Sequence, residues 1–71
     1  MEENIYSVSE IVGSSVEGVD DAIRRAVGRA SKTVRNLDWF EVSEIRGYID
    51  RERRCHFQVK MKVGFRLEEP E

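Results

Sequence analysis

The stretch CHFQVKMKVGFRL, residues 55–67, decides the fold, because its apolar and polar residues alternate without interruption. Alternation with a period of two is typical of a β-strand that buries one face and leaves the other face polar. The segment is also longer than the usual strand of about 5–6 residues. It is therefore predicted to be the central strand of a sheet. Its apolar face carries Cys55, Phe57, Val59, Met61, Val63, Phe65 and Leu67, and its polar face carries His56, Gln58, Lys60, Lys62, Gly64 and Arg66.

The preceding residues predict a hairpin partner for this strand. DRERR at 50–54 is a run of consecutive charges, typical of an exposed loop, and WFEVSEIRGYID at 39–50 is rich in strand-forming residues. Large side chains fall on both faces of residues 39–50, a pattern typical of a strand that is covered on both sides. A single helix covers one side only, so a neighbouring subunit is expected on the other.

The first half of the chain predicts a strand followed by a helix. IYSVSEIV at 5–12 is rich in β-branched residues and is expected to end at Gly13. Ser14 and Glu17 have the spacing of a capping box, which predicts a helix over about residues 16–36. Its apolar stripe is narrow and alanine-rich, so the helix is expected to pack close to the sheet. The stripe consists of Val19, Ala22, Ile23, Ala26, Val27, Ala30, Val34 and Leu37.

These elements predict an α+β fold with the order β-α-β-β. A right-handed crossover makes the first two strands parallel, and the hairpin makes the third antiparallel to the second. If the third strand lies between them, the result is a three-stranded antiparallel sheet of order 1-3-2 packed on one helix. The length of 71 residues allows one domain, which is expected to span residues 1–71.

Composition excludes several classes of protein. Lys and Arg number 12 against 14 Asp and Glu, a net charge of −2, which argues against a nucleic-acid partner. Cys55 is the only cysteine, so an intrachain disulfide and a zinc site are not expected. No apolar run approaches a membrane span, and the N-terminus lacks the layout of a signal peptide, so a cytoplasmic protein is expected. A chain this short buries roughly 60% of its unfolded surface, which favours oligomerisation.

Three side chains are candidates for ligand contacts, each with a structural alternative. Trp39 is either a core or interface anchor or a stacking platform for a flat aromatic ligand. Gln58 is either solvated or matches the imide edge of such a ligand. Arg46, beside Gly47, is either an exposed cation or part of a cross-strand salt bridge, or it contacts a phosphate, for which the glycine would leave room. No catalytic or metal-binding constellation is found, so an enzyme is not expected.

Four segments together resemble one family. EIVG at 10–13 followed by a serine-capped helix, LDWFEV at 37–42, EIRG at 44–47 and FQVKMKVGFRLE at 57–68 resemble the dodecins, small flavin-binding proteins that assemble as hollow dodecamers. The similarity covers nearly the whole chain in the right order. It implies a homododecamer whose role is flavin storage, buffering and photoprotection without turnover.

The resemblance also assigns roles to residues. It implies that Trp39 stacks a flavin pair across a two-fold axis, that Gln58 binds the pyrimidine edge, and that Arg46 binds the phosphate of FMN. It places Asp38 beside the ribityl chain. FMN is the implied cofactor, with riboflavin or FAD as alternatives. Some bacterial dodecins bind coenzyme A, and the matching positions here are Tyr6, Arg29, Thr33, Arg35 and Arg66.

Two functions therefore remain open from the sequence. The first is a flavin-binding storage protein. The second is an oligomeric scaffold or interaction protein that binds chiefly coenzyme A or no cofactor. A flavoenzyme is disfavoured, because no residue pair is suited to proton transfer and stacking on both flavin faces leaves little room for a substrate.

Overall fold

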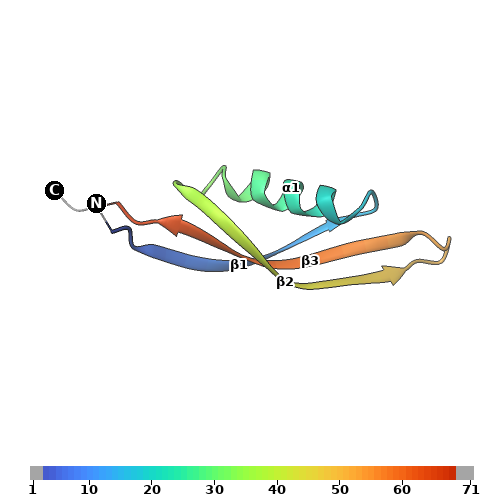
Figure 1. Ribbon diagram of the computed structural model, residues 1–71. Coiled ribbons are helices and arrows are strands. Elements are labelled where there is room, and N and C mark those ends of the chain that lie inside the picture. The colour runs from blue at the N-terminus through green and yellow to red at the C-terminus, as the bar shows by residue number, and fades with distance from the viewer. Residues whose placement is uncertain (1–2, 69–71) are drawn as a thin grey trace.

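The predicted topology is confirmed. The computed structural model describes residues 3–68, and its elements are β1 (Tyr6–Ser15), α1 (Val19–Ala30), β2 (Leu37–Ile49) and β3 (Cys55–Arg66). The strand order is β1-β3-β2, and β3 is antiparallel to both neighbours. Helix α1 lies across one face of the sheet, and the opposite face is left uncovered (Figure 1).

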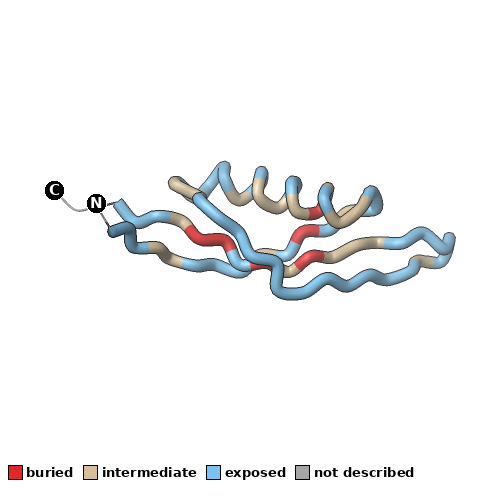
Figure 2. Tube along the Cα trace, in the orientation of Figure 1, coloured by how far each residue is buried: buried red, intermediate tan, exposed pale blue. Residues whose placement is uncertain are grey.

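The hydrophobic core is a short seam between β3 and the helix. The alternation predicted for β3 is confirmed, because Val59, Met61 and Val63 are buried against Ala22 of α1 (Figure 2). The molecule measures 55 × 21 × 15 Å, and its radius of gyration is 14.9 Å. A compact domain of this length has a radius of gyration of about 11 Å. The protomer is therefore elongated around a small core.

The helix is shorter than the sequence predicts at both ends. It begins after Gly18, whose φ of 152° favours glycine, and no side chain caps it. The predicted capping box at Ser14 is wrong, because β1 continues through Ser15 and Ser14 pairs with Gln58 in the sheet. The hydroxyl of Ser15 instead accepts a hydrogen bond from the Glu17 amide at 2.8 Å. At the other end, residues 31–36 form turns that lead into β2 rather than a continued helix.

Gly13 brings the helix close to the sheet. Contrary to prediction it does not end the first strand; it is buried within β1 and pairs with Val59. A Cβ atom at this position would lie 2.3 Å from the backbone oxygen of Ala22 and 2.9 Å from the Cβ of Ala26. The predicted close approach of the alanine-rich stripe is therefore confirmed, and a glycine in the strand is what permits it.

We expect Gly13→Ala to destabilise the fold by about 1–3 kcal/mol, because the added methyl forces α1 away from β1. The free energy of unfolding in urea measures this loss. Ser14→Ala is the matched control: Ser14 is exposed and caps no helix, so its substitution should stay within about 0.5 kcal/mol of wild type. A Gly13 variant as stable as the Ser14 variant would contradict the close contact.

Strand β2 contains two irregularities that sequence patterning missed. The register with β3 shifts between Leu37 and Trp39 and again between Val42 and Glu44. Each shift inserts one extra residue, and a β-bulge of this kind exchanges the faces of the residues that follow it. The expectation that β2 carries large side chains on both faces is confirmed, although the bulges change which residues share a face. The aliphatic residues of β2 and Phe40 lie on the helix side of the sheet, whereas the aromatic residues Trp39 and Tyr48 lie on the opposite side together with Glu41, Glu44 and Arg46.

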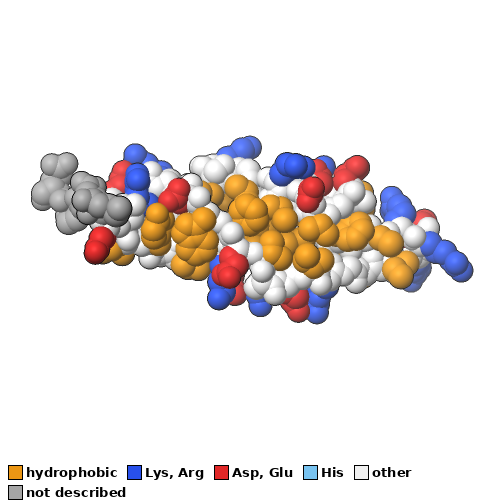
Figure 3. Space-filling model, in the orientation of Figure 1, with side chains coloured by type: hydrophobic (Ala, Val, Ile, Leu, Met, Phe, Trp, Pro, Cys, Tyr) orange, Lys and Arg blue, Asp and Glu red, His pale blue; other side chains and the backbone are white. Residues whose placement is uncertain are grey.

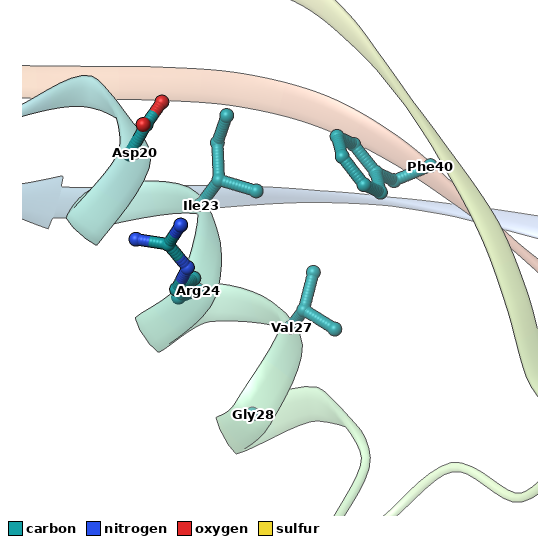
Figure 4. Close-up of a pocket in the computed structure, with 6 residues that line it drawn as sticks. All are labelled: Asp20, Ile23, Arg24, Val27, Gly28 and Phe40. Carbon is teal, nitrogen blue, oxygen red and sulfur yellow. The ribbon is translucent and has the colours of Figure 1, made fainter.

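The apolar face of β2 is nevertheless uncovered. Helix α1 packs against β1 and β3, so β2 extends beyond its cover. Hydrophobic side chains form a band along the molecule below α1 (Figure 3). Between Phe40 and the helix lies a groove of about 490 Å³, into which Ile23 and Val27 point from α1 (Figure 4). We call the exposed apolar residues of this face the β2 strip: Phe40, Val42, Ile45 and Ile49, which are 49%, 36%, 56% and 71% exposed.

Candidate functional site

The sheet face opposite α1, called the open face, carries the candidate ligand contacts at its two ends. Its middle holds charges of opposite sign in register: Lys62 lies between Glu10 and Glu41, and Lys60 lies beside Glu44. Opposite charges directly across a sheet stabilise the pairing modestly. This charged belt separates an aromatic end from an amide end, which lies nearer the β2–β3 hairpin. The aromatic end contains Tyr6, Trp39, Gly64 and Arg66, and the amide end contains Ser14, Arg46, Tyr48, His56 and Gln58.

Trp39 lies flat on the aromatic end. It pairs with Gly64 of β3, and a Cβ atom on that glycine would lie 2.1 Å from Cε2 of the indole. Cε2 lies nearer to that position than its ring neighbours Cζ2 and Nε1, as it does when the face of the indole rather than its edge covers the glycine. Gly64 is buried as a result, while Trp39 remains 39% exposed. An indole held in this way offers a stacking surface to a flat aromatic ligand.

Tyr6 and Asp38 flank the indole. The Tyr6 ring meets Trp39 edge to face, with centroids 6.2 Å apart and planes at 61°. The Tyr6 hydroxyl donates a hydrogen bond of 2.8 Å to Oδ2 of Asp38. This hydrogen bond to a carboxylate raises the pKa of Tyr6 above its ordinary value, because ionised tyrosine would lose the bond and face a like charge. Asp38 thus lies beside the stacking surface, but its carboxylate is already bonded to β1.

The amide end places Gln58 and Arg46 directly opposite each other on the open face. Among residues 3–68, no carboxylate forms an ion pair with Arg46, so the predicted alternative of a cross-strand salt bridge is not observed in that range. The role predicted for Gly47 is wrong. Gly47 pairs with Phe57 on the helix side of the sheet, so its missing side chain leaves no room beside Arg46.

The two ends are too far apart to act together within one protomer. Gly64, which carries the indole, and Gln58 are six residues apart along β3. At about 3.4 Å per residue, that separation is roughly 20 Å. A three-ring ligand stacked on Trp39 therefore does not reach Gln58 of the same chain. The predicted contacts at Trp39 and Gln58 therefore do not belong to one site within a single protomer.

A cluster at the hairpin supports the amide end, and no motif in the sequence predicts it. Asp50 accepts hydrogen bonds from the backbone amides of Glu52 and Arg54, both at 2.9 Å, and from Nε of Arg54 at 3.0 Å. His56 Nε2 lies 2.8 Å from Asp50 Oδ2. The His56 ring stacks on Tyr48 with centroids 4.5 Å apart. An aspartate that opens a charged hairpin loop is the sequence signal for such a turn.

We expect this cluster to make stability depend on pH. The hydrogen bond with His56 and those from Arg54 hold the pKa of Asp50 well below its ordinary value of 3.8. A lowered folded-state pKa stabilises the protein fully above the ordinary pKa, and this contribution disappears as the pH falls through the folded-state pKa. The difference in Tm between wild type and Asp50→Asn should therefore be largest near neutral pH and shrink below about pH 4.

Glu52→Gln is the control for this prediction, since Glu52 lies in the same loop but is 3.8 Å from Arg54 and its side chain is 71% exposed. Its effect on Tm should be small at every pH. An Asp50→Asn effect that does not change with pH would contradict the role of the carboxylate.

The residues implied for coenzyme A divide into two groups. Tyr6 and Arg66 face each other on the open face, beside Trp39. Arg29 lies in the last turn of α1, and Thr33 and Arg35 lie in the connection that follows it. Nη2 of Arg35 is 3.6 Å from Oε2 of Glu68. In the described range no hydrogen bond or ion pair joins the two groups, so the coenzyme A assignment stays a prediction.

Two further properties concern residues 3–68 as a whole. Within that range no three His, Cys, Asp or Glu side chains gather closely enough to hold a metal ion. The helix found there lacks the length and apolar character that a membrane span requires.

Comparison with known proteins identifies the family. The sequence model of the dodecin family matches residues 5–68. Dodecin from Thermus thermophilus is 54% identical over 65 residues, which cover 92% of this chain and 94% of that protein. Dodecin from Streptomyces davaonensis superposes with a TM-score of 0.89 at 56% identity, over 96% of this chain and 100% of that chain. Dodecin from Streptomyces coelicolor superposes with a TM-score of 0.87 at 54% identity, over 99% of this chain and 100% of that chain.

The chain therefore belongs to the dodecin family. The resemblance found in the sequence is confirmed, together with the fold it implies. Membership of this family implies a small binding protein that assembles with copies of itself.

Proposed function

We propose that this protein stores flavin, chiefly FMN or riboflavin, and protects it from light by stacking flavin pairs between Trp39 side chains of two subunits. The observation that carries the proposal is the indole of Trp39, which lies flat on Gly64 and is 39% exposed. Membership of the dodecin family supports a small flavin-binding protein. Each stacked aromatic face contributes about 1–3 kcal/mol, by analogy with base stacking.

The separation of the aromatic end from the amide end supports a binding site made of two half-sites from different subunits. Because about 20 Å lies between the indole and the amide end, Trp39 of one copy and Gln58 of another complete the site. The amide of Gln58 offers one acceptor and two donors in a plane, which suits the imide edge of a flavin pyrimidine ring. Affinity for flavin then depends on assembly.

The same geometry supports storage over turnover. Stacking covers both faces of each flavin, one by an indole and the other by the second flavin, so a substrate has no access to either face. Close contact with the indole permits rapid electron transfer that quenches the excited flavin. Bound flavin is expected to be yellow but weakly fluorescent, which is the behaviour of a photoprotective container.

Assembly into a hollow homododecamer is part of the proposal. The β2 strip and the groove beside Phe40 leave apolar surface that α1 does not cover. Large exposed apolar patches rimmed by charges mark interaction surfaces. The elongated protomer and its small core also favour stabilisation by neighbouring copies. Family membership supports a second copy of this chain as the occupant of this surface.

Arg46 is expected to separate FMN from riboflavin. Its guanidinium is free of ion pairs among residues 3–68 and lies beside Gln58, where it can pair bidentately with a phosphate that riboflavin lacks. A charge-assisted contact contributes about 1.5–3 kcal/mol. Arg46→Ala should therefore weaken FMN binding by about 10- to 100-fold, in fluorescence titrations at low salt, and spare riboflavin.

Riboflavin is the internal control for this prediction, and high salt should reduce the difference between the two ligands. Equal loss of both affinities would mean that Arg46 maintains the site instead of binding phosphate. If wild type binds neither flavin, the proposed function is wrong, and the alternative of a scaffold that binds chiefly coenzyme A or no cofactor takes its place.

A further inference from the structure

Trp39 is held by residues from all three strands of its own chain. Gly64 of β3 forms the floor on which the indole lies, with Cε2, Cζ2 and Nε1 within 2.1–2.6 Å of the position that a Cβ would take. The ring of Tyr6 in β1 packs edge to face against the indole, and the two ring planes meet at 61°. The indole therefore crosses the central strand from β2 toward β1.

The second constraint acts through Asp38. The register shift between Leu37 and Trp39 places Asp38 at an irregularity, and bulges of this kind redirect the side chains next to them. The carboxylate of Asp38 accepts the hydrogen bond of the Tyr6 hydroxyl at 2.8 Å, across 32 residues of sequence. This bond ties the irregular start of β2 to the opposite edge of the sheet, immediately before Trp39.

We propose that Tyr6 is a positioning residue: its ring edge and its hydrogen bond to Asp38 hold the Trp39 indole flat on Gly64, so that the stacking surface is formed before flavin arrives. This role rests on the proposed function and specifies how its central contact is prepared. The resemblance assigned Tyr6 to coenzyme A, whereas the contacts of its ring and hydroxyl lie with Trp39 and Asp38. Tyr6 therefore acts on the ligand through the residue that stacks it.

Positioning the indole in advance increases flavin affinity, because less side-chain entropy is lost when the flavin binds. A side chain that must be immobilised when a ligand binds costs affinity, whereas one already fixed does not. Loss of the Tyr6 contacts should therefore free the indole and weaken FMN binding by about 2- to 10-fold. The loss is smaller than that caused by removing the indole itself.

The test uses the full chain in its assembled form, without flavin. Trp39 is the only tryptophan, so fluorescence anisotropy decay reports the motion of this indole alone. Tyr6→Phe keeps the ring and removes the hydroxyl, and Tyr6→Leu removes both contacts. Asp38→Asn keeps an oxygen acceptor for the Tyr6 hydroxyl. Tyr48→Phe, at the amide end, is the control for loss of a tyrosine hydroxyl elsewhere.

We expect the amplitude of fast indole motion to rise from wild type to Tyr6→Phe and further to Tyr6→Leu. Asp38→Asn and Tyr48→Phe should resemble wild type in this measurement. Sedimentation should show the same assembly for Tyr6→Phe as for wild type, which keeps the test valid if Tyr6→Leu fails to assemble. FMN titrations of the Tyr6 variants should show the 2- to 10-fold loss.

Indole motion that is unchanged in Tyr6→Phe and Tyr6→Leu would overturn the proposal, whatever happens to FMN affinity. Unchanged motion with a loss of affinity would make Tyr6 a direct ligand contact instead of a positioning residue. Failure of wild type to bind FMN would refute the proposed function, and the anisotropy series would still decide whether Tyr6 positions Trp39.

Discussion

Trp39→Ala should remove most flavin binding while leaving the assembly intact. Each flavin loses the aromatic surface on one face, and stacking of this kind contributes about 1–3 kcal/mol, or roughly 5- to 150-fold in affinity. Any flavin that still binds should recover its fluorescence, because the quenching indole is absent. The fold should survive, since Trp39 lies on the open face, away from the core of Val59, Met61 and Val63.

Trp39→Phe is the matched control for this result. Phenylalanine keeps an aromatic face over Gly64 but has a smaller ring, so affinity and quenching should fall between those of wild type and the alanine variant. Fluorescence titration measures both properties in one experiment. Flavin affinity that is unchanged in Trp39→Ala would refute the stacking role.

Ile45→Asp should dissociate the assembly and abolish flavin binding with it. Ile45 is 56% exposed in the protomer and lies in the middle of the β2 strip. If a neighbouring copy covers this strip, the substitution buries an unpaired carboxylate at the interface, which costs several kcal/mol at each contact. Because the flavin site needs half-sites from two copies, dissociation and loss of flavin should occur together.

Ile45→Val separates the effect of charge from that of shape. It removes one methylene at a cost of about 0.5–1.5 kcal/mol if the site is buried in the assembly, so the assembly should persist. Sedimentation velocity distinguishes the two variants. An Ile45→Asp protein that sediments as wild type and still binds FMN would show that the β2 strip is not an interface.

The fold follows from sequence wherever periodicity is uninterrupted. β3 alternates from Cys55 to Arg66, and the structure places it at the centre of the sheet, as predicted. The predictions about β2 are wrong where an extra residue interrupts the two-residue alternation of the strand. The extra residue at Ser43 exchanges the faces of the residues that follow it, so simple alternation separates Ile45 from Phe40, whereas the structure places both on the helix side. In the sequence, the aliphatic residues switch from one alternation to the other within the strand, and this switch indicates a bulge.

The candidate site could be predicted only in part. Alternation along β3 places Gln58 on the polar face, and the structure agrees. The bond between Tyr6 and Asp38 depends on the register of strands far apart in sequence, which no local pattern reveals. Gly64 carried a recognisable signal, since glycine within a strand often marks the close approach of another group. The same signal at Gly47 is misleading for a ligand site, because Gly47 pairs with Phe57 on the helix side of the sheet.

The most direct test of the central claim is sedimentation velocity of the purified chain with FMN, recorded at the visible absorption band of the flavin. The account predicts that flavin sediments with a single large species of dodecameric mass and that its fluorescence is quenched. A folded monomer, or flavin that remains in the unsedimented fraction, would contradict a flavin store built from half-sites of neighbouring subunits.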